Sequence, residues 1–262
     1  MGKLNRSAFM GFICCFLMII VGISTNGGIG TVGNFLHLPS AIITFGGTLF
    51  AGMITSDSFQ DYIGGLKSFS KAFERQEENL DEISTTIFEL SKLARQEGLL
   101  ALEEKADTLT NEFLQKGIRL MVDGTDPELL KDILDTEMLH EEEEAKKQIH
   151  FWEDLGSYAP AWGMIGTLLG LINMMKTMST DSSSIGTGMS LALVTTLYGS
   201  IMANWICIPA ARKLTKNSDQ SLLIKELIAE GVLSIQAGDN PQIVKEKIRT
   251  YRADWEEKKE AA

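Results

Sequence analysis

Two long stretches of this sequence carry almost no charge, and they decide what the chain can fold into. Ser7–Ser56 contains no Asp, Glu, Lys or Arg, and in Leu155–Ala211 only Lys176 and Asp181 are charged. A bilayer core of about 30 Å needs about 20 apolar residues per helix, so each stretch has room for two crossings. The expected spans are 8–25, 36–55, 155–177 and 186–210. The fold class predicted is an all-α membrane protein with four transmembrane helices.

Lysine and arginine gather at only one side of the expected spans. Apart from Lys176, at the edge of span three, the two short loops between paired spans contain none. Lys and Arg beside spans stay in the cytoplasm, so both termini and the long middle segment are expected there. The start "MGKLNRS" resembles that of a cleaved signal peptide, but another span follows at once, so we expect no cleavage. The residues that set this orientation are Lys3, Arg6, Lys67, Lys71, Arg75, Lys146, Lys147, Arg212, Lys213 and Lys216.

The segment between spans two and three is charged and has the pattern of helices. Apolar residues from Leu80 to Leu93 recur at helical spacing, and Gly98 is expected to break or bend that helix. A second helix is expected at 109–122.

Two start signals predict where later helices begin. Asp126 is a natural N-cap, and Pro127 suits the first helical position. Nothing from Pro127 to Gly156 breaks a helix, so this helix is expected to run straight into span three. Beyond span four a separate amphipathic helix is expected, and Asn240 with Pro241 then starts the last one.

The predicted architecture is four membrane spans with a helical cytoplasmic domain inserted between spans two and three. Its four parts are spans one and two (1–56), the cytoplasmic domain (57–150), spans three and four (151–211) and the C-terminal helices (212–262).

The sequence shows no arrangement typical of an enzyme. It has no phosphate-binding loop, no metal-ligand spacing and no nucleophile beside a base, and its three histidines, His37, His140 and His150, are scattered. The net charge of −11 makes nucleic acid an improbable partner. We therefore expect neither catalysis nor a metal or other cofactor.

Small residues form a stripe on each of the last two spans, and such stripes let helices approach closely. Because these spans run antiparallel, Thr167 and Thr196 are expected near mid-membrane, where two hydroxyls could line an ion pathway. Pro160 and Pro209 are expected at one depth near the cytoplasmic face, where they could form a hinge. The stripes are Pro160, Gly163, Thr167 and Gly170 in span three, and Ala192, Thr196, Gly199 and Ala203 in span four.

No Asp or Glu lies inside any of the four spans. Ion transport through a membrane usually involves an acidic residue at depth. If the chain takes part in moving protons or sodium, a partner has to supply the carboxylate.

Four segments closely resemble the MotA/PomA family, the four-span stator subunits of the bacterial flagellar motor. They are "RQEGLLALE" (95–103), "YAPAWGMIGTLLGL" (158–171), "LVTTLYGSIMANWICIPAARKL" (193–214) and "EGVLSIQAGDNP" (230–241). The resemblance implies a homo-oligomer in the bacterial inner membrane, with five copies around two copies of a MotB-like partner. That partner would carry one span, an acidic membrane residue and a peptidoglycan-binding domain. Spans three and four would line the pore, and spans one and two would face lipid.

The resemblance also implies roles for particular residues. Arg95 and Glu103 match charged positions that engage the rotor protein FliG, two turns apart on an approximately continuous helix. Pro160 and Pro209 match two functional prolines, where ion binding by the partner alters the cytoplasmic part.

The coupling ion is left open between sodium and proton. "GMIGTL" and "TTLYG" are similar to sodium-driven members, whereas proton-driven members tend to have alanine at the position of Thr167. A threonine hydroxyl is a hard oxygen ligand that suits sodium, which favours sodium.

Two other functions are alternatives. An energiser of the ExbB/TolQ type would have three spans in another order and would lack "RQEGLLALE". A solute transporter would show inverted repeats or interrupted helices around a midplane site, and the sequence shows neither.

Overall fold

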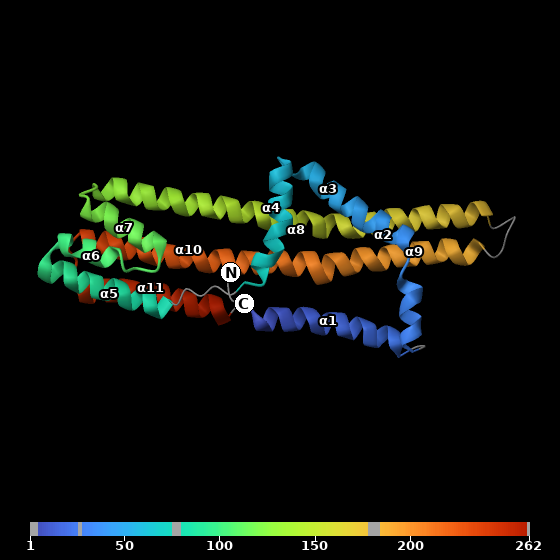
Figure 1. Cartoon of the computed structure of the whole chain (residues 1–262), viewed down its shortest axis with the longest axis horizontal. Helices are drawn as coiled ribbons and strands as arrows, with labels where there is room; N and C mark the ends of the chain where they lie inside the picture. The colour runs from blue at the N-terminus through green and yellow to red at the C-terminus, as the bar shows by residue number, and fades with distance from the viewer. Residues whose placement is uncertain (1–4, 26–27, 75–79, 178–183, 261–262) are drawn as a thin grey trace. The chain divides into compact units, whose positions relative to one another are not determined.

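The computed structural model describes residues 5–25, 28–74, 80–177 and 184–260, and this part of the chain is helical with no strand (Figure 1). Lys3 and Arg75, which help to predict the orientation, lie outside these residues. The elements are α1 (Arg6–Ser24), the 3₁₀ helix η1 (Ile29–Phe35), α2 (Leu38–Ala41), the π-helical turn η2 (Ile42–Gly46), α3 (Gly47–Thr55), α4 (Phe59–Ala72), α5 (Leu80–Glu97), the 3₁₀ turn η3 (Leu99–Ala101), α6 (Leu102–Ala106), α7 (Glu112–Val122), α8 (Pro127–Thr177), α9 (Ser184–Ile201), the π-helical turn η4 (Met202–Cys207), α10 (Ile208–Gln236) and α11 (Pro241–Glu260).

Four helices in the described residues are long and apolar enough to cross a membrane, which confirms the four-span prediction. They lie in Arg6–Ser24, Leu38–Thr55, Pro127–Lys176 and Ile185–Gln236. The third is one helix of 51 residues, as the unbroken sequence after Pro127 predicts. The fourth differs from expectation, because α10 follows η4 without a break and no separate helix begins beyond the span.

Side-chain caps explain where the charged helices begin. Asp126 Oδ1 accepts a hydrogen bond from the backbone N–H of Glu128 at 2.9 Å, and Asn240 Oδ1 accepts one from the N–H of Gln242 at 3.1 Å. Both predicted starts are confirmed. α7 begins three residues later than the predicted 109, because Asn111 caps it.

The chain forms two compact units. The first consists of residues 1–75 and 146–215, and the second of residues 76–145 and 216–262. α8 and α10 contribute residues to both units, and α4 belongs with the membrane spans of the first unit.

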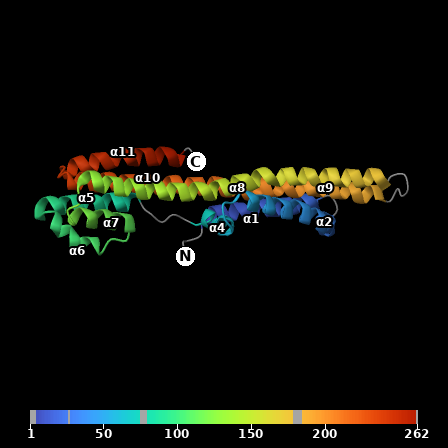
Figure 2. The same ribbon diagram turned by 90° about the horizontal axis from the view of Figure 1, so that it is seen from above.

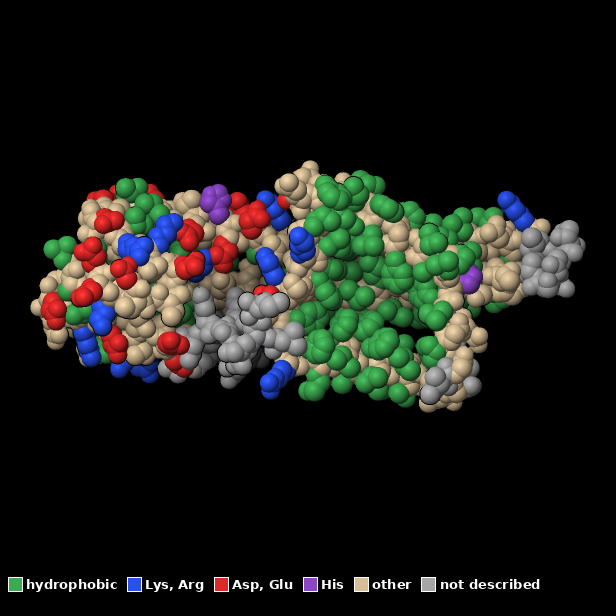
Figure 3. Space-filling view, in the orientation of Figure 1, with side chains coloured by type: hydrophobic (Ala, Val, Ile, Leu, Met, Phe, Trp, Pro, Cys, Tyr) green, Lys and Arg blue, Asp and Glu red, His purple; other side chains and the backbone are tan. Residues whose placement is uncertain are grey.

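In the first unit α8 and α9 lie side by side and antiparallel (Figures 1 and 2). Its core includes Phe151, Trp152, Leu155 and Cys207. The indole N–H of Trp152 donates to Ser68 Oγ at 2.9 Å, which satisfies a buried polar group where α4 meets α8. Hydrophobic side chains cover the visible surface of this unit, as expected for helices that face lipid (Figure 3).

The second unit has its own apolar core and a charged surface. Its fully buried side chains include Leu102, Ile118, Leu134, Ile224 and Leu227, which come from four helices. Figure 3 shows acidic and basic side chains interspersed over its visible face.

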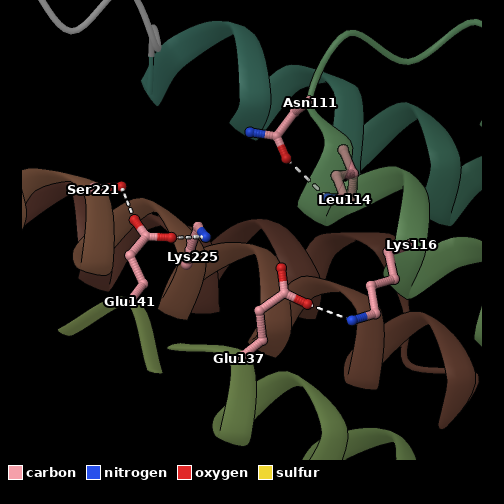
Figure 4. A network of polar contacts seen from close by, with 7 residues as sticks. All are labelled: Asn111, Leu114, Lys116, Glu137, Glu141, Ser221 and Lys225. Carbon is pink, nitrogen blue, oxygen red and sulfur yellow. Dashed lines mark hydrogen bonds and ion pairs between the residues drawn. The ribbon is translucent and has the colours of Figure 1, made fainter. Parts of the chain in front are cut away.

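Polar contacts join the helices of the second unit (Figure 4). Glu141 of α8 accepts a hydrogen bond from Ser221 Oγ at 2.8 Å and forms an ion pair with Lys225 of α10. Lys116 of α7 pairs with Glu137 of α8. The side chain of Lys225 is only 14% exposed, so Glu141 neutralises a nearly buried cation.

Lys247 fixes α11 against the end of α10. Its ammonium donates to Glu230 at 2.8 Å, to Asp239 at 3.2 Å and to Ser234 Oγ at 2.9 Å. The hydrogen bond to Glu230, followed by that to Asp239, raises the pKa of Lys247 above its ordinary value of 10.5.

Candidate functional site

Spans three and four touch through their backbones. A Cβ atom built on Gly199 would lie 2.5 Å from the carbonyl oxygen of Ala159, and one on Gly170 would lie 2.6 Å from that of Gly188. One on Gly163 would lie 2.9 Å from a carbonyl oxygen of α9. Only glycine fits such contacts, so the glycines of the two small-residue stripes lie in the interface between α8 and α9, and the close approach that the stripes predict is observed there.

The structure brings Thr167 and Thr196 together. Their hydroxyl oxygens are 2.6 Å apart, and either can be the donor. Thr167 Oγ1 also lies 3.1 Å from the carbonyl oxygen of Gly163 and 3.0 Å from that of Ala192, and Thr196 Oγ1 lies 3.2 Å from the latter. Thr196 is exposed and Thr167 is half-buried. Two hydroxyls and two carbonyls therefore meet at one level, and their role in an ion pathway stays a prediction.

This oxygen cluster has more acceptors than protons. Each hydroxyl has one proton and can accept through its lone pairs. Oxygen lone pairs therefore remain at the exposed side of Thr196. Such a group can accept a hydrogen bond from a protonated carboxyl or coordinate a hard cation.

Thr195, beside this pair, is a residue that the sequence interpretation missed. It is fully buried, and its hydroxyl donates to the carbonyl oxygens of Leu191 at 2.9 Å or Ala192 at 3.0 Å. A Cβ atom on Gly166 would lie 2.5 Å from its Cγ2 methyl. Thr195 thus packs α9 onto α8 beside the exposed Thr196, which meets Thr167 of α8.

Span two also contributes a row of buried hydroxyls, which the sequence interpretation missed. Ser40, Thr44 and Thr48 are all 0% exposed. Ser40 Oγ and Thr44 Oγ1 each lie 3.4 Å from a carbonyl oxygen of α9, those of Leu191 and Thr195. Their four-residue spacing in the sequence is the signal that could have indicated this face. Span two therefore packs one face against span four, so the expectation that it simply faces lipid is incomplete.

The two prolines lie at different levels, which corrects the expectation of one depth. Pro160 is level with Gly199, since a Cβ atom built on Gly199 would lie 3.2 Å from the Cα of Pro160. Gly156 lies opposite Cys207 and Ile208, so Pro209 lies about one to two turns farther along the axis. Both prolines are exposed. The two prolines therefore do not lie opposite each other on their antiparallel helices.

Pro209 follows a π-helical turn. The backbone N–H of Ile208 bonds to the carbonyl oxygen of Ala203, five residues back. Because a proline ring clashes with the carbonyl four residues before it, a wider turn at this place gives the ring room. The side-chain amide of Asn204, in this turn, donates to the carbonyl oxygen of Ser200 in the preceding α9 at 3.0 Å.

Arg95 and Glu103 stand on two different helices. Arg95 is in the last turn of α5 and Glu103 in the first turn of α6, and both are exposed. Between them Gly98 has φ of 89°, a left-handed conformation that ends α5. The predicted break at Gly98 is confirmed, and the expectation of one approximately continuous helix is wrong.

A metal site is not apparent in the part of the chain that the structure describes, since no group of three or more His, Cys, Asp or Glu residues there could hold an ion.

Comparison with known proteins identifies this arrangement. Residues 105–227 match the model of the MotA/TolQ/ExbB proton channel family. The chain is 39% identical to motility protein A of Treponema phagedenis, covering 95% of this chain and 94% of that one. The chain belongs to the MotA/PomA family. It is also 35% identical to chemotaxis protein PomA of Vibrio alginolyticus, covering 95% of each chain. A chain of the flagellar MotAB stator complex from Bacillus subtilis matches with a TM-score of 0.86 and 27% identity, covering 98% of this chain and all of that one.

Membership of the MotA/PomA family confirms three predictions. The chain is an all-α, multi-pass membrane protein, a stator subunit of the flagellar motor and not an enzyme. The relatives do not favour an ExbB/TolQ-type energiser or a solute transporter. The family is one of ion-coupled channels, and the identity of the ion is not determined by membership.

Proposed function

We propose that five copies of this chain surround two copies of a MotB-like subunit in the bacterial inner membrane, and that ion flow through this complex drives torque on the rotor protein FliG. The MotAB stator complex of Bacillus subtilis, which this chain resembles along its whole length, supports a MotB-like partner and an oligomer. The Lys and Arg residues at the span ends support a cytoplasmic location for both termini. In this arrangement residues 57–150 and 212–262 are the cytoplasmic parts, and residues 1–56 and 151–211 are the membrane parts.

The contact between Thr167 and Thr196 carries the proposal for the ion pathway. It lies where glycine residues let the backbones of α8 and α9 come into contact, and its exposed side presents oxygen atoms. No acidic residue lies within the four spans, so none of these spans supplies a carboxylate to these oxygens. A single-span partner with an acidic membrane residue would place a carboxylate against this oxygen cluster.

The ligand chemistry of the cluster favours sodium over a proton. A sodium ion needs several hard oxygen ligands in place of its hydration shell, and two hydroxyls with the partner's carboxylate would supply part of that set. A proton requires only the carboxylate and water. Alanine at position 167 would remove one of the two hydroxyls.

The prolines and the exposed charges complete the proposed mechanism. Pro160 and Pro209 lie on the first unit's third and fourth spans, where each removes a backbone donor from a long helix. A change of charge at the partner's carboxylate would bend α8 and α10 at these points. Arg95 and Glu103 would then present their exposed charges to complementary charges of FliG.

Swimming speed measured against external sodium tests the proposal, with potassium holding the ionic strength constant. A stator driven by sodium should speed up with sodium, and Thr167→Ala should weaken that dependence. Thr196→Ala should impair motility whichever ion is used. Thr55→Ala is the matched control, because its hydroxyl bonds only within its own helix, to Gly52 at 3.1 Å.

Two results would contradict parts of the proposal. A flat response of the parent chain to sodium means that protons drive it and that Thr167 serves packing. Ion flux into vesicles that contain this chain without a partner, at the level of the whole complex, would contradict a carboxylate supplied by the partner.

A further inference from the structure

A cavity of about 290 Å³ lies in the first unit between α1, α4 and the start of α10. Its walls are mostly aromatic and small apolar side chains, among them Phe12, Phe69, Phe73 and Trp205. Gly11 of α1 and Pro209 of α10 also line it and are exposed, so the cavity opens to the surface. We call it the α1 slot.

Aromatic contacts hold the walls of the α1 slot in place. The ring of Phe12 stacks on that of Trp205 at 4.5 Å and meets Phe73 edge-on at 5.7 Å. The indole N–H of Trp205 donates to the carbonyl oxygen of Phe12 at 3.1 Å, and the N–H of Asn5 donates to that of Phe73 at 2.7 Å. α1 is thus fixed at its N-terminal half, although it buries none of its own residues.

The lining of the α1 slot suits hydrocarbon. Its volume equals that of about ten water molecules at about 30 Å³ each, and an apolar cavity of this kind does not bind water well. A stretch of acyl chain with a similar number of methylene groups would fill it. Because α1 is exposed along an apolar, membrane-spanning helix, lipid is the molecule available at this opening.

One end of the slot carries a positive charge. Lys213 is the charged residue among the described side chains that line it. It lies one helical turn after Pro209, where the uncharged stretch of the sequence ends. Lys213 already takes part in another interaction, but its ammonium has three N–H donors and can also extend toward a lipid phosphate at the boundary of the apolar zone. An apolar slot that ends at a cation is complementary to a lipid with a negative headgroup.

We propose that the α1 slot binds one acyl chain of an anionic phospholipid, with its phosphate at the ammonium of Lys213. The site needs only that the chain spans a membrane, and does not depend on the coupling ion or on the rotor contact. Since Trp205 and Pro209 line the slot, the bound chain packs directly against η4 and the proline that follows it.

Fluorescence quenching of the delipidated full-length chain, purified with its partner in a neutral detergent, measures this binding. The probe is phosphatidylglycerol brominated on its acyl chain, whose bromines quench a tryptophan that they touch. Trp205 should be quenched at lower concentrations by this lipid than by brominated phosphatidylcholine with the same chains, and Trp205→Phe should abolish that component. Glycerol 3-phosphate, which has the charge without the chains, should neither quench nor compete.

Two variants and two matched controls separate the slot from the rest of the surface. Lys213→Gln should weaken phosphatidylglycerol binding about fivefold and leave phosphatidylcholine binding unchanged. Arg212→Gln, a substitution of the exposed neighbouring residue, is the control and should leave the binding of both lipids unchanged. Gly11→Leu should block both lipids by filling the slot. Gly22→Leu is the matched control and should leave both lipids bound. A Cβ atom on either glycine of α1 meets nothing within 4 Å, but of the two only Gly11 lines the slot.

Three results would overturn the proposal. Equal affinity for the two brominated lipids, with no effect of Lys213→Gln, would show that the slot does not recognise the charge of the headgroup. Unchanged quenching in Gly11→Leu would place the lipid elsewhere. An unquenched Trp205 in the parent complex would mean that another occupant, such as a neighbouring copy of the chain, fills the slot.

Discussion

Replacing Gly199 by alanine adds one methyl group at the tightest point between spans three and four. The added carbon would lie 2.5 Å from the carbonyl oxygen of Ala159 and 3.2 Å from the Cα of Pro160. Both neighbours are backbone atoms, which cannot move aside by changing a rotamer. Since real Cβ atoms essentially never come closer than 3.0 Å, α8 and α9 have to separate by at least about 0.5 Å.

The separation should act on the oxygen cluster one turn away. The two threonine hydroxyls are 2.6 Å apart in the parent chain, and moving the helices apart weakens this contact. Overpacking of this kind costs about 1–3 kcal/mol. We expect Gly199→Ala to insert and assemble, to unfold at a temperature several degrees lower, and to lose much of its ion flux and motility.

A second glycine on the same helix pair gives the matched control. A Cβ on Gly156 would lie 3.4 Å from Cys207 and Ile208, an ordinary contact distance. Both substitutions raise helix propensity by the same amount, about 1 kcal/mol, so the difference between them isolates the packing. The assays are thermal unfolding of the purified complex, ion flux into vesicles, and swimming. If Gly199→Ala matches Gly156→Ala in all three, the backbone contact does not hold the oxygen cluster and the reasoning is wrong.

Reversing the charge of Arg95 or Glu103 should slow motility without changing assembly or flux, because both side chains are exposed; loss of assembly would show a structural role instead. Alanine at Pro160 or Pro209 restores a backbone donor, so the complex should assemble but swim slowly, and normal swimming of both variants would refute the hinge. Lys247→Met should destabilise the chain by about 0.2–1 kcal/mol at neutral pH. Because the pKa of Lys247 is raised in the folded chain, its contribution to stability is complete below pH 10.5 and is lost as the pH rises through the raised value. The unfolding temperatures of parent and variant should therefore converge at alkaline pH. A difference that stays constant with pH would exclude the ion pairs of Lys247 as the cause of the destabilisation.

Features with a local cause could be predicted from the sequence. Span positions follow from the absence of charge, and the starts at Pro127 and Pro241 follow from a cap residue directly before each proline. The meeting of Thr167 and Thr196 follows from counting along two antiparallel helices with a short connection. These inferences need only neighbouring residues and a known helical rise.

Features that depend on packing could not be predicted in the same way. The sequence indicates a break at Gly98, but the positive φ that separates Arg95 from Glu103 is a property of the folded turn. Ser40, Thr44 and Thr48 are visible as a row, yet only the structure shows that span four covers them. The level of Pro209 relative to Pro160 cannot be predicted from distance to the span ends, because contacts between the helices set the register.

The π-helical turn η4 decides where the fourth span can change in length. Such a turn contains one residue more than an α-helical turn. Deleting one residue of Met202–Cys207 would convert the π turn into an ordinary α-helical turn, and the helix after it would keep nearly its present rotation. Ala210, Ala211 and Leu214, which are buried, would then stay in the core that they now fill, whereas the same deletion in the α-helical part of the span would rotate them by about 100°. Alignments of related chains should therefore show one-residue deletions between 202 and 207 more readily than in the α-helical parts of the span.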